Sequence, residues 1–205
     1  MFKYTKMERQ LARQQDQLSQ AVIALAQGVA LKPILHHVGE LSMQLTGARY
    51  AMISYIETGK KHYIPLGMTD DELDRLNSQA PEGIGLLGLM WNQHEVVRID
   101  DIAAHLKSAG FPPDHATMKT FLGAPIMFGD DVQGVIYLTE KADGRPFTSI
   151  DETMVRTLAS ACAVAISNAR HIEQLQARNR ELEQLLAEQE KKLSSPATDS
   201  RQSVN

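Results

Sequence analysis

Two histidines stand in the one long stretch of this chain that has no regular pattern. Residues 100–118, called the insert below, contain His105 and His115 together with one glycine and two prolines, and no helical or strand period runs through them. A neutral imidazole can bind a metal ion or carry a proton near pH 7, although a lone loop histidine is more often solvated or structural. Because long irregular segments within compact domains are more often functional than idle, the insert is the first candidate site.

Tyr137 is the second candidate, in a segment that alternates as a strand does. Val135 and Thr139 share its face in this pattern. Ile136 and Leu138 lie on the other face. A buried phenol normally finds a hydrogen-bond partner, so Tyr137 either donates to a bound ligand or is a core tyrosine that the backbone satisfies.

The single cysteine, Cys162, offers less chemistry than the histidines. One cysteine cannot form an internal disulfide, and Cys162 falls in an alanine-rich helical pattern where a small buried apolar residue would serve equally well. We therefore expect Cys162 to be part of the core.

Length and charge limit the class of protein. A chain of 205 residues fits one well-filled domain plus an additional helix. The net charge of -4, with Lys and Arg scattered along the sequence, provides no basic stripe for a phosphate backbone, so we expect no nucleic-acid partner. No signal peptide and no membrane span is evident, and we expect a reducing, cytoplasmic setting.

The elements that must position the candidates form an α+β pattern. Two helices meet near residues 28–32, with Pro33 in the first turn of the second helix and Gly47 at its end. Glycines mark the turns of two hairpins, and Asp151 is expected to cap the last helix. The remaining segments are strands at 49–57, 61–66, 96–99, 120–128 and 132–140 with short helices at 70–79 and 86–91. This order predicts an antiparallel sheet flanked by N- and C-terminal helices.

The last helix continues into a heptad pattern. Its a positions are Ile172, Asn179, Leu186 and Leu193, and its d positions are Leu175, Leu182 and Gln189. Such a seam predicts a parallel homodimer, in which a buried Asn at one a position sets register; an ordinary amphipathic surface helix is the alternative. The expected organisation is an N-terminal helix at 1–30, a domain at 31–170, a coiled-coil helix at 171–195 and a disordered polar tail at 196–205.

Several motifs in the domain resemble those of GAF domains over roughly residues 31–170. They are Gly83-Ile-Gly-Leu-Leu-Gly, Val97-Arg-Ile-Asp-Asp-Ile-Ala-Ala-His, Ser108-Ala-Gly-Phe-Pro-Pro-Asp-His, Met118-Lys-Thr-Phe-Leu-Gly-Ala-Pro-Ile and Gly134-Val-Ile-Tyr-Leu-Thr-Glu-Lys. Within that superfamily the chain is most similar to the haem-bearing GAF domain of dormancy-type oxygen and redox sensor histidine kinases.

This resemblance implies a ligand set. In the haem-bearing relatives the histidine of the Gly-Phe-Pro-Pro-x-His loop is the proximal iron ligand, a role that carries over to His115. Their tyrosine on the penultimate strand faces the distal side of the haem, a role that carries over to Tyr137. Ser54 stands at the first-strand position where some relatives carry an acidic residue. His105 is the alternative ligand or a sixth one, and Met118 or Met127 is a further option.

A haem also requires an apolar slot, which nearby segments could supply. The expected lining residues are Ile84, Leu86, Leu87, Leu89 and Met90, with Phe111, Met118 and Leu122 from the far side. Each of these side chains would serve equally well in an ordinary core.

The resulting expectation is a non-enzymatic sensor that contains b-type haem. It would detect a diatomic gas (O2, NO or CO) or a redox change and act as a homodimer on a separate signalling protein, because no kinase, cyclase or DNA-binding segment is evident. The rival hypothesis is a haem-free GAF module for dimerisation and docking. A cyclic-nucleotide signature and a phosphate-binding Gly-rich loop are both missing, and Cys162 is misplaced for sulfoxide reduction or bilin attachment.

Overall fold

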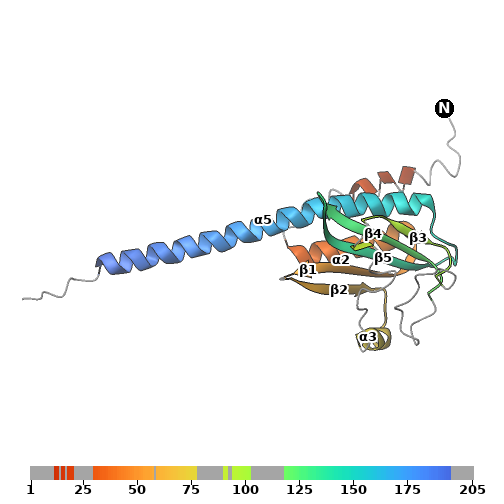
Figure 1. Ribbon diagram of the computed structural model, residues 1–205, viewed down its shortest axis with the longest axis horizontal. Helices are drawn as coiled ribbons and strands as arrows, with labels where there is room; N and C mark the ends of the chain where they lie inside the picture. The colour runs from red at the N-terminus through yellow and green to blue at the C-terminus, as the bar shows by residue number, and fades with distance from the viewer. Residues whose placement is uncertain are drawn as a thin grey trace, which may run out of the picture. The chain divides into compact units, whose positions relative to one another are not determined.

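The described strands form one antiparallel sheet. The computed structural model describes residues 12–13, 15–16, 18–20, 30–57, 59–77, 90–91, 94–102 and 118–194. In these ranges the strands are β1 (Ala48–Glu57), β2 (Lys60–Leu66), β3 (Val97–Ile99), β4 (Phe121–Phe128) and β5 (Asp131–Lys141), in the spatial order β2-β1-β5-β4-β3. The expected α+β class with an antiparallel sheet is confirmed (Figure 1).

The two expected hairpins are the β1–β2 and β4–β5 pairs. Every neighbouring pair of strands runs antiparallel, and β5 lies between β1 and β4 at the centre of the sheet. Gly59 and Gly129 have φ values of 76° and 62°, a left-handed conformation that glycine adopts without steric cost in a tight turn. The glycines on which the hairpin predictions depend therefore stand at the turns.

Helix α2 (Leu31–Thr46) and residues 149–169 of α5 (Ser149–Ser194) cover one face of the sheet. In α2 the buried apolar residues recur at helical spacing, and the helix ends at Gly47, whose φ is 73° and whose N–H donates to Met43 O at 2.8 Å. Pro33 lies in the first turn, as expected. We call the core on this side of the sheet the helix-side core; it includes Leu35, Ile53 and Ile136.

The first turn of α5 is closed by a capping box. Thr148 Oγ1 accepts from the Asp151 N–H at 3.2 Å, and Asp151 Oδ2 accepts from the Thr148 N–H at 2.7 Å. The N-cap residue is therefore Thr148, which corrects the expectation that Asp151 caps the helix. Asp151 is the third residue of the helix and completes the box.

Cys162 belongs to the helix-side core, as expected. Its side chain is fully buried, and burial raises the pKa of its thiol to about 12. Since a thiolate is the reactive form of cysteine, this side chain is a packing residue at neutral pH.

The chain divides into two compact units, residues 1–169 and residues 170–205. A third helix, α3 (Asp70–Asn77), belongs to the first unit and begins with three acidic residues. Helix α5 continues through the second unit as far as Ser194. None of the helices in the described ranges combines the length and the apolar composition that a bilayer crossing requires. The predicted tail at 196–205 lies outside the described residues.

Candidate functional site

A second apolar cluster covers the sheet face opposite the helix-side core. Its buried members are Met90, Ile99, Ile102, Phe121, Val135 and Tyr137, which we call the Tyr137 cluster. Met52, Trp91 and Met118 are half-buried and pack against it. Since β5 alternates between the two faces, Tyr137 lies in this cluster, and its neighbours Ile136 and Leu138 lie in the helix-side core.

Tyr137 is buried, and its hydroxyl contacts Trp91 and Ser54. Trp91 Nε1 donates to Tyr137 Oη at 3.2 Å, and Ser54 Oγ lies 3.4 Å from the same oxygen. Burial raises the pKa of Tyr137 to about 12, and the hydrogen bonds of Ser54 and Trp91 oppose that rise. The side chain is therefore a neutral phenol at physiological pH.

This raised pKa predicts an alkaline loss of stability that depends on Tyr137. The neutral phenol favours the folded state, so the contribution is fully present below pH 10 and is lost as the pH rises from 10 towards 12. A shift of two units corresponds to about 2–3 kcal/mol. We expect Tyr137→Phe to unfold with a weaker pH dependence than wild type in urea titrations between pH 9 and 11.5. If the free energies of unfolding of wild type and Tyr137→Phe differ by a constant amount between pH 9 and 11.5, Tyr137 does not have a raised pKa in the folded state.

Met90 lies against the sheet at Gly123, beside Tyr137. Met52 on β1 and Gly123 on β4 are the register partners of Tyr137 on β5. A Cβ at Gly123 would collide with Met90 Sδ, so the absence of a side chain there makes room for the thioether. The Met90 side chain consequently fills the space next to Tyr137 and is fully buried.

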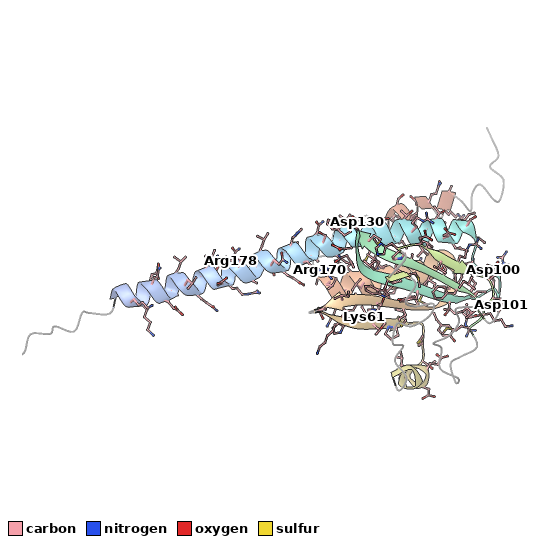
Figure 2. All side chains as sticks on the ribbon, viewed as in Figure 1. Lys61, Asp100, Asp101, Asp130, Arg170 and Arg178 are labelled. Carbon is pink, nitrogen blue, oxygen red and sulfur yellow. The ribbon has the colours of Figure 1, made fainter. Side chains whose placement is uncertain are left out.

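Trp91 is held from two sides. Besides its hydrogen bond to Tyr137, its ring lies under the Lys61 ammonium at 4.7 Å, a cation–π distance. Lys61 projects from β2, at one edge of the sheet (Figure 2). Met90 therefore packs in the Tyr137 cluster, and Trp91 binds its hydroxyl.

The base of the insert is fastened to the sheet at both ends. The Ile102 N–H donates to Lys119 O at 2.8 Å, which brings the two ends of the insert together. Glu140 Oε1 accepts from the N–H groups of Lys119 and Thr120. Glu140 itself has a φ of 54°, a left-handed conformation that costs a non-glycine residue of order 1 kcal/mol or more.

Two strands beside the base of the insert also contact the start of α5. On the entry side, Arg98 of β3 donates to Phe147 O at 3.1 Å and lies 3.5 Å from Glu152. Lys141 of β5, the neighbour of Glu140, forms a 2.8 Å ion pair with Asp151, whose side chain is buried, while that of Lys141 is largely buried. Polar contacts therefore join the base of the insert to the first turn of α5.

The structure places three of the predicted site residues together. Tyr137 and Met90 are buried members of the Tyr137 cluster, and Met118 packs against it. The prediction that Leu122 lines this site is corrected, because Leu122 faces the helix-side core, whereas its neighbour Phe121 faces Tyr137. The predicted residues outside the described ranges are His115, His105, Ile84, Leu86, Leu87, Leu89 and Phe111.

Sequence reasoning did not assign three residues that contact this site. They are Trp91, Lys61 and Glu140, and their contacts depend on pairing between distant strands. Ser54 was noted only for its departure from the relatives. Over the ranges that the structure describes, no group of three His, Cys, Asp or Glu side chains could hold a metal ion.

Residues 30–167 match the GAF_2 family model, described as GAF domain. The GAF domain of the Acinetobacter phosphoenolpyruvate-protein phosphotransferase superposes with a TM-score of 0.63 at 20% identity, covering 82% of this chain and 97% of that one.

Two other similar structures come from proteins with different roles. Free methionine-R-sulfoxide reductase from Neisseria meningitidis, in complex with its substrate, has a TM-score of 0.60 at 16% identity, covering 83% of this chain and 96% of that one. Residues 122 to 287 of a methyl-accepting chemotaxis protein have a TM-score of 0.60 at 18% identity, covering 77% of this chain and 99% of that one. At these identities the likeness concerns the fold alone.

Proposed function

We propose that this chain, which belongs to the GAF domain family, is a sensor domain that binds b-type haem through His115 and signals without catalysing a reaction. The family is one of sensory and signalling modules, and haem as the ligand of this member is the more specific part of the proposal. The observation that carries it is the buried, neutral Tyr137 phenol on an apolar sheet face, beside the fastened base of the insert that contains His115.

The described side chains fit a haem in their chemistry. A porphyrin needs an apolar slot, and the Tyr137 cluster is apolar apart from one hydroxyl. When bound, the haem would supply an iron that takes a diatomic gas (O2, NO or CO) or changes redox state. His115 would provide the axial imidazole, and the protonated Tyr137 would present a hydrogen-bond donor from the sheet.

Binding requires Met90 and Trp91 to leave the space above Tyr137. Met90 is unbranched and adaptable, and it meets the sheet where Gly123 has no side chain. Trp91 would exchange one hydrogen bond and one cation–π contact. These contacts are weak enough for a ligand that buries a large apolar surface to replace them.

Haemin titration of the purified chain tests the proposal. Trp91 is the single tryptophan, so the intrinsic tryptophan fluorescence reports on the Tyr137 cluster alone. We expect a Soret band that saturates at one haem per chain and a quenching of Trp91 with the same midpoint. A Soret band without quenching would place the haem elsewhere on the protein, and a colourless protein would reject the haem.

Tight packing of Met90 and Trp91 favours the second candidate, a haem-free GAF module. In that case the Tyr137 cluster is an ordinary core, and function depends on the helices and a protein partner. The absence of both the Soret band and the quenching would select this candidate.

A non-catalytic role is supported by the position of Cys162. The thiol is fully buried in the helix-side core, on the opposite side of the sheet from Tyr137, and burial raises its pKa to about 12. A catalytic thiol needs access to its substrate and a lowered pKa. We propose that a separate signalling protein receives the output.

A further inference from the structure

The second unit of the chain exposes a row of leucines on α5. Leu175 is 66% exposed, Leu182 44% and Leu186 60%. Their spacing of seven and four residues places them on one side of a helix, about two turns and one turn apart. Three exposed leucines within about three turns of one helix face, with Asn179 between the first two, indicate a surface that a partner covers.

The residues beside this row divide by charge. With Asn179 and Leu186 at a, and Leu175 and Leu182 at d, the g and e positions flank the seam on its two sides. The g positions are His171, Arg178, Leu185 and Lys192, and the e positions are Gln176, Glu183 and Glu190. The g side therefore carries no acid, and the e side carries no base.

This separation of charges favours one partner, a second copy of the helix, in one orientation. A parallel copy of the same helix places each g position against the e position of the partner's next heptad, so Arg178 faces Glu183 of the partner subunit twice per dimer. An antiparallel copy places g against g and e against e, which brings cations to cations and carboxylates to carboxylates. The charges attract in the first arrangement and repel in the second.

We infer that a second copy of this chain covers the leucine face of α5, in parallel and in register, and that the Arg178–Glu183 pairs between subunits fix this orientation. Asn179 then meets its own equivalent at the dimer axis, where a buried Asn pair favours two strands in register. In the single chain Arg178, labelled on α5 in Figure 2, binds Glu181 at 2.7 Å, and both side chains are exposed. The Arg178–Glu181 pair competes with the Arg178–Glu183 pair between subunits, so the ion pairs change the dimer dissociation constant only modestly.

Charge reversal tests the orientation in the full chain without haem. We expect Arg178→Glu to raise the dimer dissociation constant about tenfold in sedimentation equilibrium, because two attractive pairs become repulsive. The double variant Arg178→Glu with Glu183→Arg should return to within about twofold of wild type. Arg180→Glu, which makes the same charge change at a b position away from the seam, is the matched control and should leave the constant unchanged.

Disulfide trapping provides an independent readout. In a parallel, in-register pair Asn179→Cys places two thiols across the axis, so mild oxidation should give a covalent dimer. Wild type should not crosslink, because its Cys162 is fully buried.

Three outcomes would overturn the inference. They are a monomer at tens of micromolar, a dimer that Asn179→Cys does not crosslink, and equal effects of Arg178→Glu and Arg180→Glu. All three are measured without haem, so they are independent of the outcome of the haemin titration.

Discussion

Replacing His115 by alanine is expected to remove stable haem binding. Imidazole is the usual axial donor to b-type haem in gas sensors. We expect the apparent dissociation constant for haemin to rise by about a hundredfold or more, since even residues that only orient a ligand cost 10–100-fold. The Soret band and the quenching of Trp91 should weaken together in the titration.

Three controls separate ligation from folding. Free imidazole in the buffer should restore the Soret band of His115→Ala, because it can occupy the vacated coordination position. His171→Ala changes an exposed histidine on α5 and should bind haemin as wild type does. His105→Ala tests the alternative ligand. Unchanged haemin affinity in His115→Ala would contradict the assignment of His115, and a loss confined to His105→Ala would transfer the role to His105.

The fold was largely predictable because turn glycines and apolar spacing mark the ends of most strands and helices. Gly59 and Gly129 mark turns between alternating segments, and Gly47 ends a helix whose apolar spacing is regular. The described strands begin and end within one residue of the predicted ones. Each of these features depends on residues close together in the chain, so the sequence alone determines them.

The apolar pattern of β4 does not reveal which sheet face Leu122 lies on. Phe121 and Leu122 are both fully buried because β4 lies between β5 and β3 and carries apolar clusters on both faces. A strand that is apolar on both sides has no polar residue to indicate which face is which. The register with β5 resolves the ambiguity, since Gly123 is the partner of Tyr137 and Leu122 is the partner of Leu138.

Contacts of the candidate site also depend on this register. Ser54 and Tyr137 are 83 residues apart, and Trp91 is 46 residues from Tyr137. No short-range motif brings such residues together, so the polar contacts of the phenol could not be predicted. The left-handed conformation of Glu140 could not be predicted either. It is stabilised by hydrogen bonds to the N–H groups of Lys119 and Thr120, which lie about 20 residues away in the sequence.

The end of β5 joins the insert to the last helix. Glu140 binds the backbone where the insert returns to β4, and its neighbour Lys141 binds Asp151 in the capping box of α5. Two consecutive residues therefore fix two different segments. A displacement of the insert by a ligand on His115 would have a short route to the start of α5, through three side chains whose contacts are known.

Lys141→Met is expected to destabilise the domain by about 3 kcal/mol, because removing one partner of a buried ion pair leaves the other charge uncompensated. The Lys141 and Asp151 side chains are only 12% and 5% exposed. The value lies at the low end of the usual range because the Thr148 N–H and hydroxyl still donate to the carboxylate. Urea unfolding measures the change.

The surface pair between Lys32 and Glu57, with side chains 64% and 38% exposed, provides the matched control. Lys32→Met should cost less than about 1 kcal/mol, because solvent screens an exposed pair. Adding Asp151→Asn to Lys141→Met should recover part of the loss, since no buried charge is then left alone. Equal costs for the two lysine variants would mean that burial of the Lys141–Asp151 pair contributes nothing, and the first turn of α5 would then depend on the capping box alone.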